Sequence, residues 1–142
     1  MHQAVIDYVA HHLPDFPGDV LDVGGRDING TPRWLFENAD SYRVVDLHEG
    51  DNVDVVGDIT ALGLSGVADT VLCLEVLEHA DNWRDIVAAC VAACRPGGRR
   101  ARVPLIFRVL RLLQGKYGSF VSKNTVDRYL QSRPLRSRSG FS

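Results

Sequence analysis

Three aspartates stand at the ends of successive apolar segments of the sequence, where parallel strands would bring them together. They are Asp22, Asp46 and Asp58. A carboxylate at the end of one strand can accept hydrogen bonds from both hydroxyls of a ribose, and another can accept a bond from the exocyclic amine of a base. One acidic residue after an apolar segment is usually a solvated loop residue. Three at successive segments predict one shared ligand site.

A pair of glycines, Gly24-Gly25, follows the first apolar segment. Glycine lets the backbone adopt positive φ and approach a ligand closely, although an ordinary tight turn remains the alternative. A Walker phosphate loop is not supported, because Thr31 stands after Gly30 where that loop needs a lysine. A dinucleotide fingerprint is not supported either, because Arg26 stands at its second glycine. A ligand with a ribose but no pyrophosphate remains.

These residues need a fold that gathers strand ends, and the apolar pattern predicts one. Strands are predicted at 19–23, 42–45, 52–56 and 68–74, and helices at 3–13, at 32–38 with Thr31 as N-cap, and from Asp81 as N-cap to Cys94. Alternating strands and helices form a parallel sheet, and its ligands bind beyond the carboxyl ends of the strands. We therefore predict an α/β fold, a Rossmann-like three-layer sandwich with strand order 3-2-1-4-5. Residues 101–103 would be the fifth strand.

The charge of the chain changes sign after Gly97-Gly98, although the whole chain carries only −2. Residues 1–98 hold 17 acidic residues against 5 arginines, a net of −12, and residues 99–142 hold 11 lysines and arginines against one aspartate, a net of +10. We therefore predict a core at 1–98 and a basic C-terminal extension at 99–142. The extension is expected to contain an amphipathic helix at 104–114 and a disordered end.

Composition sets the class of protein. The 142 residues, 45% hydrophobic and 24% charged, are typical of one soluble globular domain and exclude collagen-like and wholly disordered chains. We expect no membrane span, because no apolar run reaches about 18 residues, and no secretory signal in the polar first 20 residues. Three cysteines without the spacing of a disulfide scaffold indicate a reduced, cytoplasmic protein.

Taken together, the motifs resemble the class I S-adenosylmethionine-dependent methyltransferases, in the broad methyltransferase-domain family. The resemblance covers about residues 19–98 in the order and spacing of that family. Its most specific part is the block Leu74-Glu-Val-Leu-Glu-His79, followed by a helix and Arg95-Pro-Gly-Gly98. The other segments that carry it are 20–30, 44–46, 55–58 and 69–73.

The resemblance implies S-adenosyl-L-methionine as the cofactor and assigns residues to its methionine end. Asp22 and the backbone at Gly24 and Gly25 are expected to hold that end. The backbone at Leu74 and Glu75 is expected to meet the methionine amine and carboxylate.

The resemblance also assigns residues to the adenosine end. Asp46 is expected to bind the ribose hydroxyls, with Leu47 flanking the adenine. Asp58 is expected to bond the adenine amine, while the backbone N–H of Ile59 reaches a ring nitrogen.

Some residues depart from the pattern or allow more than one interpretation. Arg26 replaces the commoner second glycine, where it either crowds the methionine carboxylate or binds it. His79 follows the fourth strand, and a role at the helix entry is favoured over a catalytic base, so no catalytic residue is assigned. Cys73, Cys90 and Cys94 are predicted to pack in the core rather than bind a metal.

The segment 99–142 leaves two classes of function open. Family members continue after Pro-Gly-Gly with further strands that we do not find here, so the last strands of the fold are expected to be missing, in a natural short form or a truncated reading frame. The chain is then a working methyltransferase for a small-molecule or macromolecular acceptor, or an inactive cofactor-binding remnant whose basic tail binds nucleic acid, a membrane surface or a protein. Self-association through the unpaired sheet edge or residues 104–114 is also expected.

Overall fold

A parallel four-stranded sheet organises the molecule. The computed structural model describes residues 3–12 and 17–95. The strands are β1 (Asp19–Val23), β2 (Ser41–Asp46), β3 (Val55–Val56) and β4 (Thr70–Cys73), in the order β3-β2-β1-β4. This order agrees with the first four positions of the predicted 3-2-1-4-5 sheet. The predicted fifth strand, the helix at 104–114 and the rest of the basic extension lie outside the described residues.

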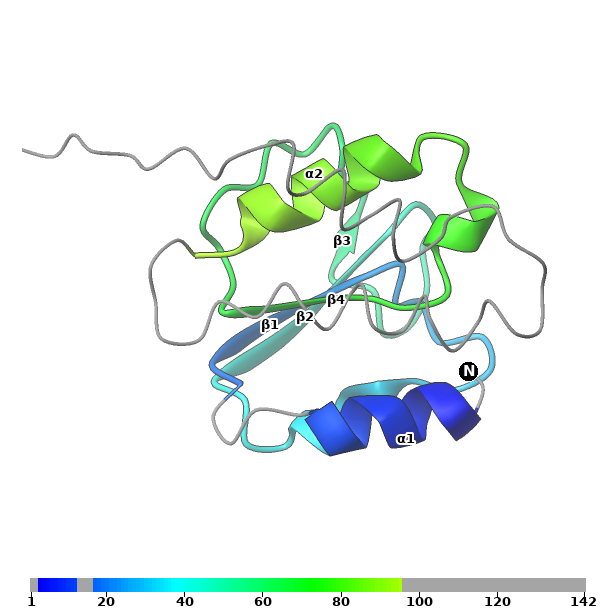
Figure 1. The fold of residues 1–142 in the computed structure, drawn as a ribbon, viewed down its shortest axis with the longest axis vertical. Coiled ribbons are helices and arrows are strands. Elements are labelled where there is room, and N and C mark those ends of the chain that lie inside the picture. The colour runs from blue at the N-terminus through cyan, green and yellow to red at the C-terminus, as the bar shows by residue number, and fades with distance from the viewer. Residues whose placement is uncertain (1–2, 13–16, 96–142) are drawn as a thin grey trace, which may run out of the picture.

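Helices cover the two faces of the sheet, which makes the three layers visible in Figure 1. Helix α1 (Gln3–His12) lies on one face and α2 (Trp83–Ala93) on the other. Two short 3-10 helices complete the described part, η1 (Pro32–Phe36) before β2 and η2 (Leu77–His79) after β4. No helix among the described residues is long and apolar enough to cross a membrane.

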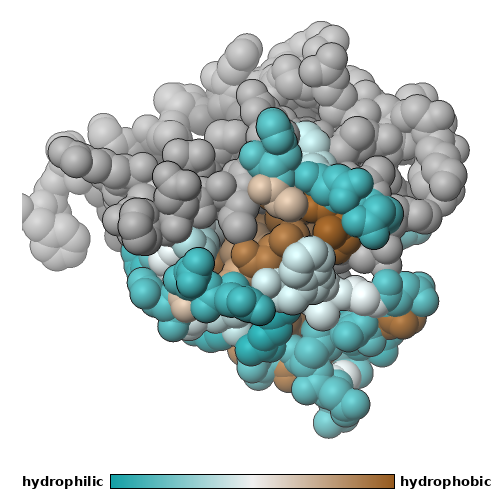
Figure 2. Space-filling view, turned by 90° about the horizontal axis from the view of Figure 1, so that it is seen from below, coloured by the Kyte–Doolittle hydropathy of each residue, from teal (hydrophilic) through white to brown (hydrophobic). Residues whose placement is uncertain are grey.

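The alternating side chains of β1 separate two cores. Leu21 and Val23 pack in the cluster beneath α2, and Val20 packs in the cluster with Val5 and Val9 of α1. This is the period-two alternation of a strand that is covered on both faces. The described surface is mostly hydrophilic around a smaller hydrophobic patch in the view from below (Figure 2).

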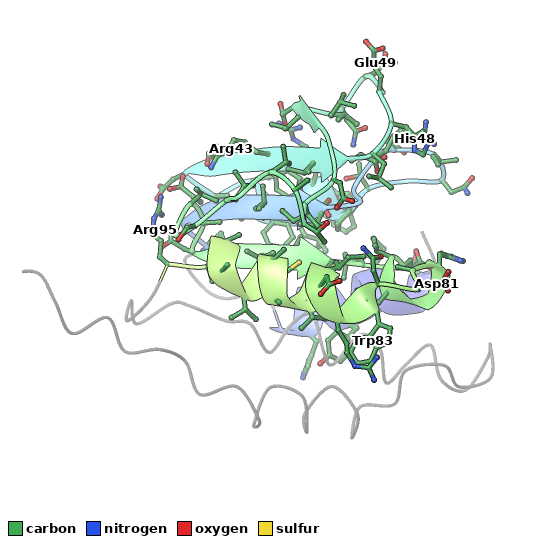
Figure 3. All side chains as sticks on the ribbon, turned by 90° about the horizontal axis from the view of Figure 1, so that it is seen from above. Arg43, His48, Glu49, Asp81, Trp83 and Arg95 are labelled. Carbon is green, nitrogen blue, oxygen red and sulfur yellow. The ribbon has the colours of Figure 1, made fainter. Side chains whose placement is uncertain are left out.

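An ion-pair cluster fixes the amino ends of the strands. The Arg95 guanidinium lies 2.7 Å from an oxygen of Asp19 and 2.7 Å from an oxygen of Asp69. Asp19 also accepts a bond from the Ser41 hydroxyl, and this bond, followed by Arg95, lowers the pKa of the Asp19 carboxyl. Because Arg95 follows α2, the cluster ties the end of this helix to β1 and to the entry of β4 (Figure 3).

Helix α2 and strand β3 begin at other residues than the sequence predicted, and β4 spans Thr70–Cys73 rather than 68–74. Helix α2 has Asn82 rather than Asp81 at its N-cap, and the Asn82 side chain makes no capping bond. Asp81 lies one position earlier and lines the cleft described below. Strand β3 begins at Val55 rather than at residue 52. The Asp54 carboxylate accepts the Val44 N–H at 2.7 Å, so a side chain takes the place of a backbone acceptor at this point. The regular backbone pairing with β2 therefore starts at Val55, one residue after Asp54.

The Thr31 cap was predicted correctly, but the element after it is short. The Thr31 hydroxyl accepts the Arg33 N–H at 3.2 Å, and Pro32 follows as the first residue of η1. The five residues of η1 form a 3-10 helix that ends at Phe36, whereas a helix to residue 38 was expected.

Alanine substitutions at two separate glycines, Gly18 and Gly63, test the packing at the amino ends of the strands. Gly18 and Gly63 both have positive φ, +64° and +63°, but a Cβ on Gly18 would lie 2.3 Å from the Asp69 carboxylate while a Cβ on Gly63 would meet open space. We expect Gly63→Ala to cost about 1–2 kcal/mol through its backbone conformation alone. Gly18→Ala should cost at least about 1 kcal/mol more, because Asp69 must leave its partners. Urea unfolding measures both, and equal losses would contradict this packing.

Candidate functional site

A cleft of about 560 Å³ opens at the carboxyl ends of the strands. Strands β1 and β2, helix α2 and the segments that follow β3 and β4 form its wall, through Val23, Gly24, Asp46, Leu47, His48, Gly57, Asp58, Ile59, Val76, His79 and Ile86 among others. His48 and Asp81 lie at this end of the sheet, opposite Arg43 and Arg95 (Figure 3). The cleft volume is in the range of sites for small organic ligands.

Asp46 ends β2 with its carboxylate held in place by backbone donors. The Arg26 N–H donates to Oδ2 at 3.2 Å and the His48 N–H donates to Oδ1 at 2.9 Å. The His48 ring nitrogen Nδ1 lies 3.7 Å from Oδ1. A carboxylate oxygen accepts more than one hydrogen bond, so Asp46 is an oriented acceptor for a pair of ligand hydroxyls.

Asp58 follows β3 and is oriented by its own turn. Its Oδ1 accepts the Thr60 N–H at 2.8 Å and the Thr60 hydroxyl at 2.7 Å. These two bonds lower the pKa of the Asp58 carboxyl, so this exposed group is ionised at neutral pH. An ionised acceptor at this place suits a ligand amine.

The glycine turn brings the exits of β1 and β4 close together. Gly24 has φ +74°, and a Cβ there would lie 2.3 Å from a methyl group of Val76. Its N–H donates to the Val45 carbonyl at 2.7 Å. The turn therefore requires glycine both for its backbone conformation and for the space that Val76 occupies.

A buried carboxylate lies against the second glycine. Asp22 is 1% exposed, and a Cβ on Gly25 would lie 2.3 Å from its Oδ2 atom. The Tyr42 hydroxyl donates to the same oxygen at 2.6 Å. Burial raises the pKa of Asp22 to about 6, the bond from Tyr42 acts against this rise, and the Asp46 charge adds to it.

The residues implied by the resemblance fall into two groups. The cleft wall holds Gly24, Asp46, Leu47, Asp58 and Ile59.

The other four lie beside that wall or behind it. Asp22 is buried against Gly25, as described above. Leu74 is 4% exposed and packs in the core beneath α1, and Glu75 has φ +55°, an uncommon conformation for a residue with a side chain. These positions suit a role for the backbone rather than for side chains in the wall.

Two residues that support the glycine turn were missed. Tyr42 stands at the start of a predicted strand, and Asn52 stands in another. The Asn52 amide donates to the Gly25 carbonyl at 2.8 Å and accepts the Asp27 N–H at 2.8 Å. No sequence signal indicated either role, since both partners are 20 or more residues away along the chain.

The remaining candidate residues lie as follows. Cys73, Cys90 and Cys94 are free thiols buried in the core, as predicted, and burial raises the pKa of Cys94 to about 12. Within 3–12 and 17–95, no three acidic, histidine or cysteine side chains gather as metal ligands. His79 is exposed in η2 and lines the cleft, which leaves its imidazole accessible to a ligand.

Comparison with known families and solved structures gives a consistent result. Residues 33–101 match the methyltransferase domain family. A solved structure from Methanococcus maripaludis, described as an S-adenosyl-L-methionine-dependent methyltransferase, aligns with a TM-score of 0.51 at 13% identity and covers 90% of this chain and 74% of its own. At that identity the structural likeness supports the α/β fold.

Curated relatives match the chain at moderate identity. The ubiquinone biosynthesis O-methyltransferase of Burkholderia multivorans is 37% identical over 87 residues, which are 57% of this chain and 38% of that protein. The enzyme of the same name from Erwinia tasmaniensis is 32% identical over 113 residues, 66% of this chain and 45% of that protein. The chain therefore spans less than half the length of these relatives.

The raised pKa of Asp22 implies a pH dependence of the free energy of unfolding. Between about pH 4 and pH 6 the unfolded chain releases the Asp22 proton while the folded chain keeps it. The contribution of this group is thus present below about pH 4 and lost as the pH rises through about 6. The shift from 3.8 to about 6 corresponds to about 3 kcal/mol.

We therefore expect Asp22→Asn to gain up to about 3 kcal/mol relative to the natural chain between pH 4 and pH 7. Urea unfolding over this range measures the difference. Asp58→Asn is the control, because its lowered carboxyl pKa makes its difference change in the opposite direction and below about pH 4. A constant difference for Asp22→Asn over the range contradicts the raised pKa.

Proposed function

Because residues 33–101 match the methyltransferase domain family, we propose that the cleft binds S-adenosyl-L-methionine and that the chain transfers the methyl group to an acceptor. The observation that carries the proposal is the position of Asp46. Its oriented carboxylate ends β2 in the same cleft as the Gly24 turn and Asp58. Each end of the cofactor thus has a complementary group in one cleft.

The residues present fit this cofactor. Asp46 accepts from the two ribose hydroxyls, and Leu47, which is 63% exposed at the cleft wall, offers an apolar surface to the adenine ring. Asp58 accepts from the adenine amine, and the backbone of Ile59 lies beside it. The Gly24 turn has no side chain to obstruct the methionine end.

The chemistry asks mainly for positioning. The bound cofactor supplies a methyl group on a sulfonium, which is already activated for transfer. The chain holds both ends of the ligand, so the acceptor can meet the methyl group in line and in a fixed place. The buried core beneath the cleft, with Val45 and Ile86 at its wall, keeps water from that side.

The acceptor atom that we propose is an oxygen, because the curated relatives are named O-methyltransferases. Of the two histidines that line the cleft, His48 lies beside Asp46, and His79 follows β4. His79 is thus the imidazole placed away from the ribose side, where it can take a proton from an acceptor hydroxyl. We also propose a cytoplasmic location, which the three free thiols support.

Calorimetric titration with S-adenosyl-L-methionine and its demethylated product tests the proposal. Asp46→Ala removes two charge-assisted hydrogen bonds, about 3–5 kcal/mol, and should weaken binding by a hundredfold or more. Asp40→Ala is the matched control, since Asp40 is exposed and its N–H bonds Gly18 at the opposite end of the sheet. Unchanged affinity in a folded Asp46→Ala chain refutes the assignment, and tighter binding of NAD indicates a dehydrogenase-like protein instead.

The His79 assignment has its own test. We expect His79→Ala to lower the methyl-transfer rate for a phenolic acceptor by about 100-fold or more while the cofactor affinity stays within about twofold. A turnover assay measures the methyl-transfer rate, and calorimetry measures the cofactor affinity separately. An unchanged rate would contradict the role of His79 as a base and would leave it a role at the helix entry only.

A further inference from the structure

Arg26 stands where the glycine pattern has its second glycine, and the proposed roles so far do not use its side chain. The residue is half-buried and lines the cleft. Its Nε atom is buried and has no hydrogen-bond partner among the residues that the structure describes. Leaving a charged donor buried without an acceptor costs free energy. Because Arg26 is only half-buried and lines the cleft, the other nitrogens of its guanidinium group can meet an acceptor that a ligand supplies.

Side chains from outside the turn hold the backbone around Arg26 on both sides. Asn52 donates to the Gly25 carbonyl and accepts the Asp27 N–H, each at 2.8 Å. The N–H of Arg26 itself donates to Asp46 at 3.2 Å. One amide side chain therefore pairs with the two peptide groups that flank Arg26, much as a neighbouring strand would.

The aliphatic part of the Arg26 side chain, its stem, is also held in place. A Cβ on Gly50 would lie 2.9 Å from Cγ and 3.0 Å from Cδ of Arg26, so the stem crosses Gly50 in close contact. Backbone and stem are thus both fixed, which restricts where the guanidinium group can lie. An arginine whose backbone and stem are already fixed loses less conformational entropy when it binds an anion.

Arg26 has no ion-pair partner among the residues that the structure describes. Within the described part of the chain, Arg95 has ion pairs with carboxylates, whereas none is found for Arg26. Asp46 directs its oxygens to the backbone N–H groups of Arg26 and His48. A carboxylate that enters the cleft would meet a guanidinium without an acidic partner.

We propose that Arg26 binds the carboxylate of the methionine part of S-adenosyl-L-methionine, and that Asn52 is its positioning residue. The inference rests on the proposed cofactor and names a recognition residue for it. Arg26 follows the glycine turn directly and is bonded to Asp46, so one ligand that spans turn and ribose site passes beside it. The carboxylate is the only anionic group of this ligand, and the arginine fork suits it.

A thermodynamic cycle that removes Arg26 from the protein and the carboxylate from the ligand tests the contact. We expect Arg26→Ala to weaken binding of S-adenosyl-L-methionine by about 10- to 100-fold. Binding of decarboxylated S-adenosylmethionine, which keeps the sulfonium and the ribose, should change by less than about threefold. Arg84→Ala is the control, since Arg84 is an exposed arginine that lies over the Trp83 ring and does not line the cleft.

The positioning role has a separate readout. Asn52→Ala should reduce the preference for S-adenosyl-L-methionine over its decarboxylated form, and adding Asn52→Ala to Arg26→Ala should reduce it no further than Arg26→Ala does alone. A variant that only loosened the fold would weaken both ligands equally. Urea unfolding confirms that each variant is folded under the titration conditions.

The outcomes separate the two levels of the proposal. Equal losses for both ligands in Arg26→Ala, or tighter binding of S-adenosyl-L-methionine, overturn the carboxylate contact, and the second result shows instead that Arg26 crowds the ligand. If the natural chain binds neither ligand while it is folded, the proposed function itself fails. Loss restricted to the carboxylated ligand supports both.

Discussion

The register of the parallel sheet is the constraint on which the site depends. Val23 of β1 lies opposite both Val45 of β2 and Cys73 of β4, and Val45 in turn lies opposite Val55 of β3. All four strands therefore end close to one line across the sheet. The segments that follow must turn into the same space, so residues as far apart along the chain as Val23 and Ile86 converge there.

The two ends of the sheet are stabilised by different means. At the amino ends, Arg95 forms direct ion pairs with Asp19 and Asp69. At the carboxyl ends, Asp22 is buried beside a glycine, Glu75 adopts positive φ, and the Nε atom of Arg26 has no acceptor in the described part of the chain. Strain and unsatisfied groups gathered at one end are typical of a binding site rather than of a structural edge.

The sequence predicted the features that depend on the local residue pattern and on the common edge at which parallel strands end. Asp46 and Asp58 were expected in one cleft with Gly24, and they line one cleft, because strand ends in a parallel sheet meet at one edge. Asn52 could not be found in the same way, since its amide acts on a turn 27 residues earlier. The late start of β3 depends on the Asp54 carboxylate replacing a backbone acceptor, and apolar periodicity carries no information about that exchange.

The charges of the cleft explain why a single arginine there can govern selectivity. Asp46, Asp58 and Asp81 line the same wall, so the cleft favours a cationic ligand over a neutral or anionic one. A sulfonium and an ammonium gain from these carboxylates, but so would any small cation. Only a ligand that also carries a negative group at the right separation can use Arg26, whose neighbours Asn52 and Gly50 fix its place. Discrimination therefore comes from the spacing of opposite charges, which a carboxylate-lined cleft alone cannot provide.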